Sequence, residues 1–428
     1  MKQHFSEVAA ITSPGPGVEV VSNRDGITIY EVPMLRKLSP VADIFAFLRL
    51  VRIIRRLKPV IVHAHTPKAG FLGIAAASFC RVPVRVFTLH GLRSSGGNDA
   101  IKKLLVAESE RFTCRFSQRV FVVSHSLLKE ASEQGLCCKD KMKVLVNGTC
   151  NGIDAKGTFN PDNYPSDTRA TIRQKNHIPL NAIVLGFVGR IVRDKGIGEL
   201  IAAWQKLRDE FPDLYLLVVG DHETEDRVDD QLVRVLEQDS RIRRIGFVYS
   251  VAVYYLGMDI VVLPTYREGF PYVPLESGAM GLPIVASRVC GCVDAIEDER
   301  TGLLVPPRDI ARLYAAIKRL IVDEPFRRGL GQAGRQRVLE NFAQERLWEA
   351  LLEEYVNLIH KSRSSSKWRP STKAKNHYGE LSPVGDDQAG HALGYSHVQN
   401  NLPQQGFRLH GGSPPDHPGH RRGDPPGR

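Results

Sequence analysis

Short apolar runs alternate with segments of helical periodicity along most of the chain. In its first part these runs predict four buried strands, at 60–65, 84–89, 119–124 and 143–146. A second series predicts four more strands, at 182–188, 214–220, 259–263 and 282–287. Continuous apolar strands separated by helices are typical of parallel sheets that are covered on both faces. The pattern therefore predicts an α/β protein.

The two series are separated by a polar, proline-containing stretch from about 159 to 179. Because 428 residues exceed what one hydrophobic core usually holds, we expect two domains, at 1–165 and 180–360. An apolar helix is expected at 71–79, and further helical segments are expected at 198–211 and 229–238. Two further amphipathic helices, at 310–322 and 344–360, are expected to close the second domain.

From about residue 361 the composition turns to Gly, Pro, His and Gln without apolar clusters, which predicts a disordered tail over 361–428. The formal net charge is +11; ten Lys/Arg and five Asp/Glu leave +5 in this tail and +6 in residues 1–360. A basic balance favours anionic partners such as phosphorylated substrates or membrane surfaces. Residues 1–360 contain no array of basic and aromatic residues and no zinc-finger pattern, so we expect no nucleic-acid partner.

The chain has seven cysteines, an odd number, and no apolar segment typical of a signal peptide at its start. We therefore expect reduced thiols and a cytoplasmic location. Cys290-Gly-Cys292 could form half of a metal site, but no second pair lies at zinc-site spacing, so neither a metal nor another cofactor is expected. No apolar run reaches the roughly eighteen residues of a transmembrane helix.

Two carboxylates follow the strand at 259–263. Glu268 is expected in the loop after the strand, and Glu276 within the helix at 272–280. Ligands of open parallel sheets bind at the carboxyl ends of strands, where helix N-termini favour anionic groups. Glu276 could then accept hydrogen bonds from ribose hydroxyls, and Glu268 from a sugar hydroxyl. The alternatives are a helix-dipole role for Glu276 and a solvated loop charge for Glu268.

Between these carboxylates lies the loop Gly269-Phe270-Pro271, in which Gly269 permits close approach of the backbone to a ligand.

A second candidate loop follows the strand at 182–188. Gly189 makes the turn there, and Arg190 and Lys195 are expected to point toward the same sheet edge. Two fixed cations can bind a diphosphate and stabilise the charge that develops when it leaves. The alternative is a pair of surface cations.

Gly189-Arg190…Lys195-Gly196, the pair Glu268 and Glu276, and the run 301–307 make the chain resemble the family 4 retaining glycosyltransferases. The resemblance covers almost all of residues 5–360. It implies the GT-B fold, in which two Rossmann-like domains face each other. In such enzymes the Arg and Lys bind the diphosphate of a nucleotide-sugar donor, the first Glu faces the sugar, and the second faces the ribose. The nucleotide base is expected near Gly246 and Phe247.

The first domain resembles the subgroup that extends lipid-linked surface glycans, through the runs 63–70, 88–91 and 147–154. This resemblance places His90 near the donor sugar; the alternative is a satisfied histidine at a strand end. His65 and Lys68 could contact an acceptor phosphate. The implied reaction is transfer of a hexose-type sugar from a donor, expected to be UDP-linked, to a lipid-linked or glycan acceptor in surface-polysaccharide synthesis.

The family pattern also predicts a strand and a glycine-containing loop before the strand at 9–13. That first strand is missing from the sequence pattern, and Met1 is expected to fall in the helix that follows it. A truncated, catalytically impaired remnant that binds nucleotide sugars is therefore an alternative. A sugar-nucleotide epimerase of the same fold is another, although the paired Gly189–Lys195 and Glu268–Glu276 motifs disfavour it.

The segment 42–56 predicts a basic amphipathic helix. Arg49, Arg52 and Arg56 share one face, while Ile44, Leu48, Val51 and Ile54 are expected to lie away from it. Such a helix can rest on anionic headgroups at the inner face of the cell membrane. The alternative is an ordinary helix that covers the sheet and exposes a solvated basic face.

Overall fold

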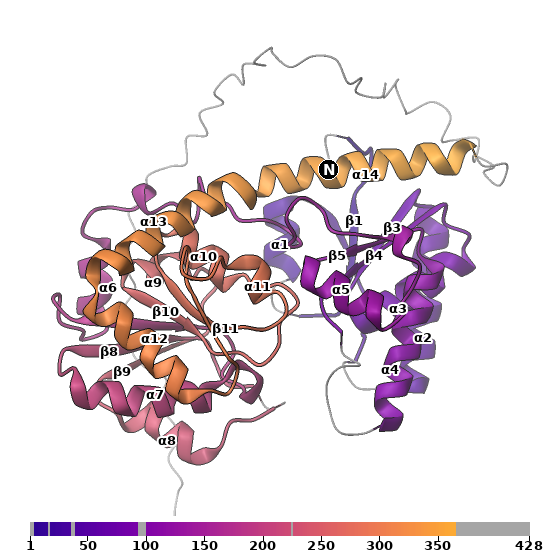
Figure 1. Ribbon diagram of the computed structural model, residues 1–428. Helices are drawn as coiled ribbons and strands as arrows, with labels where there is room; N and C mark the ends of the chain where they lie inside the picture. The colour runs from indigo at the N-terminus through magenta and orange to yellow at the C-terminus, as the bar shows by residue number, and fades with distance from the viewer. Residues whose placement is uncertain (1–3, 16–17, 36–38, 93–99, 224–225, 365–428) are drawn as a thin grey trace, which may run out of the picture. The chain divides into compact units, whose positions relative to one another are not determined.

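The computed structural model describes residues 4–15, 18–35, 39–92, 100–223 and 226–364, which form two doubly wound α/β domains (Figure 1). The predicted tail lies outside these residues except for 361–364. Those four residues continue the last helix, α14 (Gln344–Ser364), rather than beginning a disordered segment. All strand pairs within the named sheets are parallel, as the apolar runs predict.

The first domain has a four-stranded sheet in the order β3-β4-β5-β6. Its strands are β3 (Ile61–His65), β4 (Val84–Leu89), β5 (Arg119–Val122) and β6 (Met142–Lys143). The helices of this domain are α1 (Val18–Asp25), α2 (Pro40–Leu57), α3 (Pro67–Phe79), α4 (Ala100–Phe116) and α5 (His125–Glu133). The strands start within three residues of the predicted positions because strong apolar runs determine them.

A separate two-stranded parallel sheet pairs β1 (Ala9–Thr12) with β2 (Thr28–Glu31). Ile11 of β1 and Val62 of β3 pack in one apolar cluster, which residues of α2 and α3 complete. Within the described ranges, no strand connects β1 to β3. Residues 4–8 form a turn and irregular backbone, so the predicted helix at the start is not found in them; its first residues, 1–3, lie outside the description.

Alternation along β4 sends its side chains to two different layers. Phe87 and Leu89 belong to the large cluster that includes residues of α3 and α5, whereas Val84 and Val86 pack with Leu347 of α14. The sequence interpretation assigned 344–360 to the second domain. The structure instead packs the apolar face of this helix on the first sheet (Figure 1), because Val84 and Val86 need a cover on that face.

The second domain contains a six-stranded sheet in the order β12-β11-β10-β7-β8-β9. Its strands are β7 (Ile183–Val188), β8 (Leu214–Val219), β9 (Ile242–Gly246), β10 (Ile260–Leu263), β11 (Ile284–Ser287) and β12 (Leu303–Val305). Its helices are α6 (Thr168–Lys175), α7 (Ile197–Glu210), α8 (Asp230–Gln238), α9 (Ala252–Leu256), α10 (Val273–Ala279), α11 (Cys292–Ala295), α12 (Ile310–Val322) and α13 (Glu324–Asn341). Residues of α7, α8 and α12 cover one face of this sheet.

Helix α2 has a buried apolar side, as predicted, but a wider exposed one. Val51 and Ile54 are buried, whereas Ile44 and Leu48 are 59% and 55% exposed. The four apolar residues predicted to lie away from the arginine face therefore divide into a buried pair and an exposed pair. None of the helices in the described part of the chain is both long and apolar enough to cross a bilayer.

Candidate nucleotide-sugar site

The candidate site lies where the strand order of the second sheet reverses. The chain runs from β7 outward through β8 and β9, and then returns to place β10 on the other side of β7. Open α/β sheets bind ligands at this switch point, outside the carboxyl ends of the two strands. The loop after β7 carries Arg190 and Lys195, and the loop after β10 carries Glu268. The two motifs predicted from sequence therefore meet at the switch point.

Lys195 and Glu268 form an ion pair that connects the two loops. Both side chains are largely buried, with 18% and 12% of their surface exposed. The loops are also held by Tyr266, whose backbone N–H donates to the carbonyl of Asp194 at 2.8 Å, and by an ion pair between Arg267 and Asp194 at 2.7 Å. Glu268 is thus not a solvated loop charge. It is fixed beside a cation in a poorly hydrated position.

Arg190 projects separately from Lys195. Its guanidinium pairs with Glu223 at 2.7 Å, in the loop that follows β8, and remains 55% exposed. The predicted pair of cations therefore lies on one sheet edge but contacts two different carboxylates. An exposed ion pair of this kind contributes little to stability. Arg190 can therefore exchange Glu223 for an anionic ligand at a small cost in free energy.

Glu276 lies in the first turn of α10, and its carboxylate accepts a hydrogen bond of 2.7 Å from the hydroxyl of Tyr255. Tyr255 belongs to α9 and is fully buried. Burial raises the pKa of Glu276, and the hydrogen bond from Tyr255 partly offsets this by lowering it. The hydroxyl of Tyr255 therefore orients the Glu276 carboxylate. The sequence analysis did not identify Tyr255, because a tyrosine in a short apolar helix does not indicate that it binds a carboxylate.

Gly269 lies against the first domain. A Cβ atom at this position would be 1.7 Å from the carbonyl oxygen of His90, so only glycine fits without movement of one backbone. The carbonyl of Gly269 accepts a hydrogen bond of 2.7 Å from Ser124, at the N-terminus of α5. Phe270 and Pro271 are buried behind it. The backbone of Gly269 thus lies close to the backbone of His90.

The loop after β9 completes this edge of the sheet. The N–H of Gly220, after β8, donates to the carbonyl of Gly246 at 2.9 Å, and the N–H of Gly189 donates to Val219 at 2.9 Å. Phe247 stands beyond Gly246 and is 68% exposed, so its ring is accessible to a planar group. Sequence reasoning identified Gly189 and Gly246 but missed Gly220, which ends the strand between them.

The first domain places His65 and His90 together at the carboxyl ends of β3 and β4. Nδ1 of His65 lies 3.2 Å from Nε2 of His90. Lys68, the other residue predicted to meet an acceptor phosphate, forms an ion pair of 2.7 Å with Asp43 of α2. His65 thus contacts His90, and Lys68 contacts Asp43.

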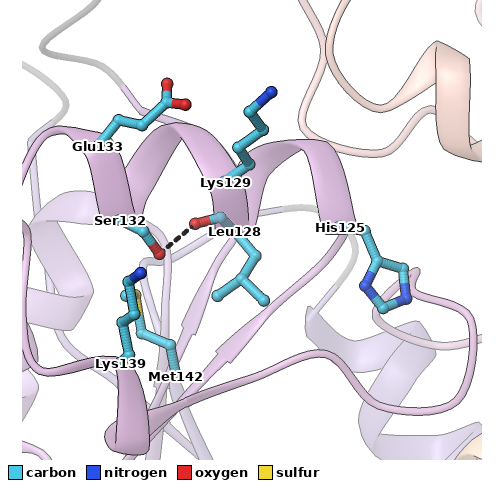
Figure 2. Close-up of a pocket in the computed structure, with 7 residues that line it drawn as sticks. All are labelled: His125, Leu128, Lys129, Ser132, Glu133, Lys139 and Met142. Atoms are coloured by element: carbon cyan, nitrogen blue, oxygen red, sulfur yellow. Dashed lines mark hydrogen bonds between the residues drawn. The ribbon is translucent and has the colours of Figure 1, made fainter.

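A pocket of about 450 Å³ lies elsewhere, beside α5 (Figure 2). Its lining consists of seven residues, none of which belongs to the predicted site: His125, Leu128, Lys129, Ser132, Glu133, Lys139 and Met142. The Ser132 hydroxyl donates to the carbonyl of Leu128 at 2.7 Å, within the same helix. The switch point of the second sheet, not this pocket, gathers the candidate chemistry.

Known proteins resemble the chain in both domains. The family model for glycosyl transferases group 1 matches residues 168–337, and that for the glycosyl transferase 4-like domain matches residues 1–148. The capsular polysaccharide biosynthesis glycosyltransferase CapM of Staphylococcus aureus is 31% identical over 85% of this chain and 93% of its own length. The chain belongs to this family of glycosyltransferases. It is an enzyme of the transferase class.

Two further proteins agree with this assignment. The Escherichia coli UDP-Gal:alpha-D-GlcNAc-diphosphoundecaprenol alpha-1,3-galactosyltransferase is 25% identical over 78% of this chain and 85% of its own length. The crystal structure of Anabaena HepE in complex with UDP-glucose has a TM-score of 0.69 and 19% identity, over 82% of this chain and 99% of that one. The glycosyltransferase thus has the GT-B fold of two Rossmann-like domains.

Within the described ranges of the glycosyltransferase, no group of three or more His, Cys, Asp or Glu side chains is arranged to hold a metal ion. Cys290 and Cys292, considered above as half of a metal site, are both free thiols. Cys290 instead lies 3.3 Å from the hydroxyl of Ser126. The switch point itself brings together two cations, Arg190 and Lys195, and the carboxylate of Glu268.

Proposed function

We propose that this glycosyltransferase is a retaining enzyme that moves a hexose-type sugar from a UDP-linked donor to a lipid-linked acceptor in the synthesis of surface polysaccharide. The observation that carries the proposal is the Lys195–Glu268 pair across the switch point. It holds a cation suited to a diphosphate beside a carboxylate suited to a sugar hydroxyl. Glu276, oriented by Tyr255, is the proposed partner of the ribose, and Phe247 marks the proposed place of the base.

Departure of the nucleoside diphosphate builds negative charge on its leaving oxygen. In this proposal Arg190 and Lys195 stabilise that charge, because preorganised cations act most strongly where charge develops in the transition state. Lys195 is held in place by Glu268, whereas Arg190 lies on the solvent side and closes on the diphosphate by leaving Glu223. We propose that these two side chains supply the positive charge without a protein-bound metal.

Two observations support a lipid-linked acceptor. The first is that the relative from Escherichia coli is named for a diphosphoundecaprenol acceptor and CapM for capsular polysaccharide synthesis. The second is the exposed side of α2, where Phe45, Ile44 and Leu48 are apolar surface residues. Arg49 and Arg52 are exposed on the same helix. Apolar side chains flanked by arginines suit the interface of an anionic bilayer.

We therefore place the enzyme peripherally, with α2 against anionic lipid at the cytoplasmic face of the membrane. Sedimentation with vesicles tests this contact. The protein should bind vesicles that contain phosphatidylglycerol and bind pure phosphatidylcholine vesicles much less. Phe45→Ser combined with Arg52→Glu should abolish the difference, whereas the exposed Trp348→Ser, on α14, serves as a control. Equal binding of the double variant and the wild type would exclude α2 as the membrane contact.

Incubation with a panel of radiolabelled sugar nucleotides and a membrane lipid extract tests the transfer reaction. We expect label from one UDP-sugar to appear in the lipid fraction. NMR of the product should show that the transferred sugar keeps the anomeric configuration that it has in the donor. Arg190→Ala should slow this transfer by about 10²-fold or more. Arg193→Ala, three residues further along the same loop and paired with Asp226, is the matched control. Tight UDP binding without turnover would favour the remnant, and an epimerised nucleotide sugar would favour the epimerase.

A further inference from the structure

Three histidines gather on one side of the first sheet. His63 and His65 alternate along β3, so both side chains point to the same face, and His90 follows the end of the adjacent strand β4. The rings of His63 and His65 stack with their centroids 4.3 Å apart, and those of His65 and His90 lie 5.4 Å apart. The Nδ1 of His65 and the Nε2 of His90 are 3.2 Å apart, which is a hydrogen-bonding distance.

His63 forms the fixed base of this stack. Its Nδ1 lies 2.5 Å from the hydroxyl of Tyr355 in α14, and its Nε2 lies 2.7 Å from the hydroxyl of Thr88. Both ring nitrogens are therefore in use, and the ring cannot rotate without losing one of these part-buried hydrogen bonds. The ring of His65, which is exposed to solvent on its other side, stacks on this fixed ring. The stack thus fixes the position of the Nδ1 that faces His90.

Burial favours the neutral form of all three rings. Burial lowers the pKa of His63 well below its ordinary value, and burial together with the nearby His90 lowers the pKa of His65 to about 4. Burial also lowers the pKa of His90. A neutral imidazole is a weak partner for a phosphate. The neutral form of His65 therefore disfavours the acceptor-phosphate role considered above. Its contact with His90 points to a different role.

The contact determines which nitrogen of His90 remains for a ligand. A neutral imidazole has one N–H donor and one acceptor nitrogen, and the bond to His65 uses Nε2. Among the described residues, Nδ1 of His90 has no hydrogen-bond partner. The backbone of the same residue touches Gly269, next to Glu268 in the candidate donor loop. His90 therefore stands between the histidine stack and the place proposed for the donor sugar.

We propose that His65 is a positioning residue for His90: its Nδ1 holds Nε2 of His90 so that Nδ1 of His90 faces the donor sugar. This rests on the proposed function, because it needs a donor at the switch point. The two rings share one hydrogen bond, so their tautomers are coupled. When His65 donates, Nδ1 of His90 carries the proton and donates to a sugar hydroxyl. A neutral ring suits this place better than a cation, which would repel the positive charge that develops on the sugar.

The variants His65→Leu and His65→Asn distinguish the effect of the hydrogen bond to His90 from the effect of side-chain volume. Leucine fills a similar volume without a polar atom, whereas asparagine places an amide near the position of Nδ1. We expect His65→Leu to lower kcat for the active UDP-sugar by about five- to tenfold, the value of one hydrogen bond, with the Kd for UDP unchanged. His65→Asn should restore most of the loss. Equal kcat for the leucine variant and the wild type would overturn the proposal.

Imidazole ¹⁵N NMR tests the same contact without turnover. In the wild type the ring nitrogens of His90 should show one dominant tautomer near pH 7, and in His65→Leu they should shift toward a mixture. An unchanged His90 spectrum in the leucine variant would overturn the inference even if transfer were observed. Absence of turnover by the wild type with every sugar nucleotide, together with the expected tautomer shift, would instead refute the proposed function and leave the positioning contact established.

Discussion

Replacing Tyr255 by phenylalanine removes a single buried oxygen atom and no volume that matters to packing. The hydroxyl that is lost donates to the carboxylate of Glu276 at 2.7 Å. Hydrogen bonds to charged groups are worth about 1.5–3 kcal/mol. If the carboxylate grips the ribose of the donor, part of this energy will appear as weaker nucleotide binding. A loss of about 1.4 kcal/mol in binding corresponds to a tenfold higher Kd.

We therefore expect Tyr255→Phe to weaken UDP binding about tenfold by calorimetry and to lower Tm by about 2–4 °C per kcal/mol of lost stability. Tyr254→Phe is the matched control: it is the adjacent residue of α9, half-buried, and its hydroxyl has no hydrogen-bond partner among the described residues. It should change neither quantity. A lower Tm for Tyr255→Phe with unaltered UDP affinity would refute the reasoning, because Glu276 would then be oriented for packing and not for the nucleotide.

Three other predictions concern the same site. Because burial raises the pKa of Glu276, its carboxylate takes up a proton at a higher pH than an ordinary glutamate; UDP affinity should fall with acidification through that raised pKa, and Glu276→Gln should bind weakly with a flat pH profile in calorimetry. Gly269→Ala should reduce turnover at saturating donor, because its Cβ would lie 1.7 Å from the carbonyl of His90; wild-type kcat would contradict the close contact. EDTA should leave UDP binding unchanged, and loss of binding that Mg²⁺ restores would show that the cations of the site are not sufficient.

The eight strands of the two predicted series were predictable because each is a short apolar run bounded by polar residues, whereas β2, Thr28–Glu31, forms no such run. The helix predicted at 310–322 agrees with α12 at both ends, since its apolar residues recur with helical spacing. Helix α13 was missed because its three glycines lower helix propensity. The structure gives at least one of them a packing reason: a Cβ on Gly331 would lie 2.1 Å from the carbonyl of Gly281.

The residue types of the site were predictable, but their pairing was not. Motif spacing placed Lys195 and Glu268 after the ends of two strands, yet only the strand order brings β7 beside β10 and so joins them. Tyr255 and His65 act through contacts between distant segments. No local pattern distinguishes a tyrosine that supports a carboxylate from one that fills a core. The spacing of His63 and His65 was visible, but His90, the partner of His65, follows another strand.

The packing of α14 on the first sheet has a consequence for biosynthesis. A ribosome that has completed the strands of the first domain, up to Lys143, must still translate to Gln344 before this helix emerges. At roughly 5–20 residues per second this takes on the order of tens of seconds. During that interval Val84, Val86 and Phe121 have no cover from their final partner. The nascent first domain therefore exposes one apolar face, which chaperones can bind, until α14 has been synthesised.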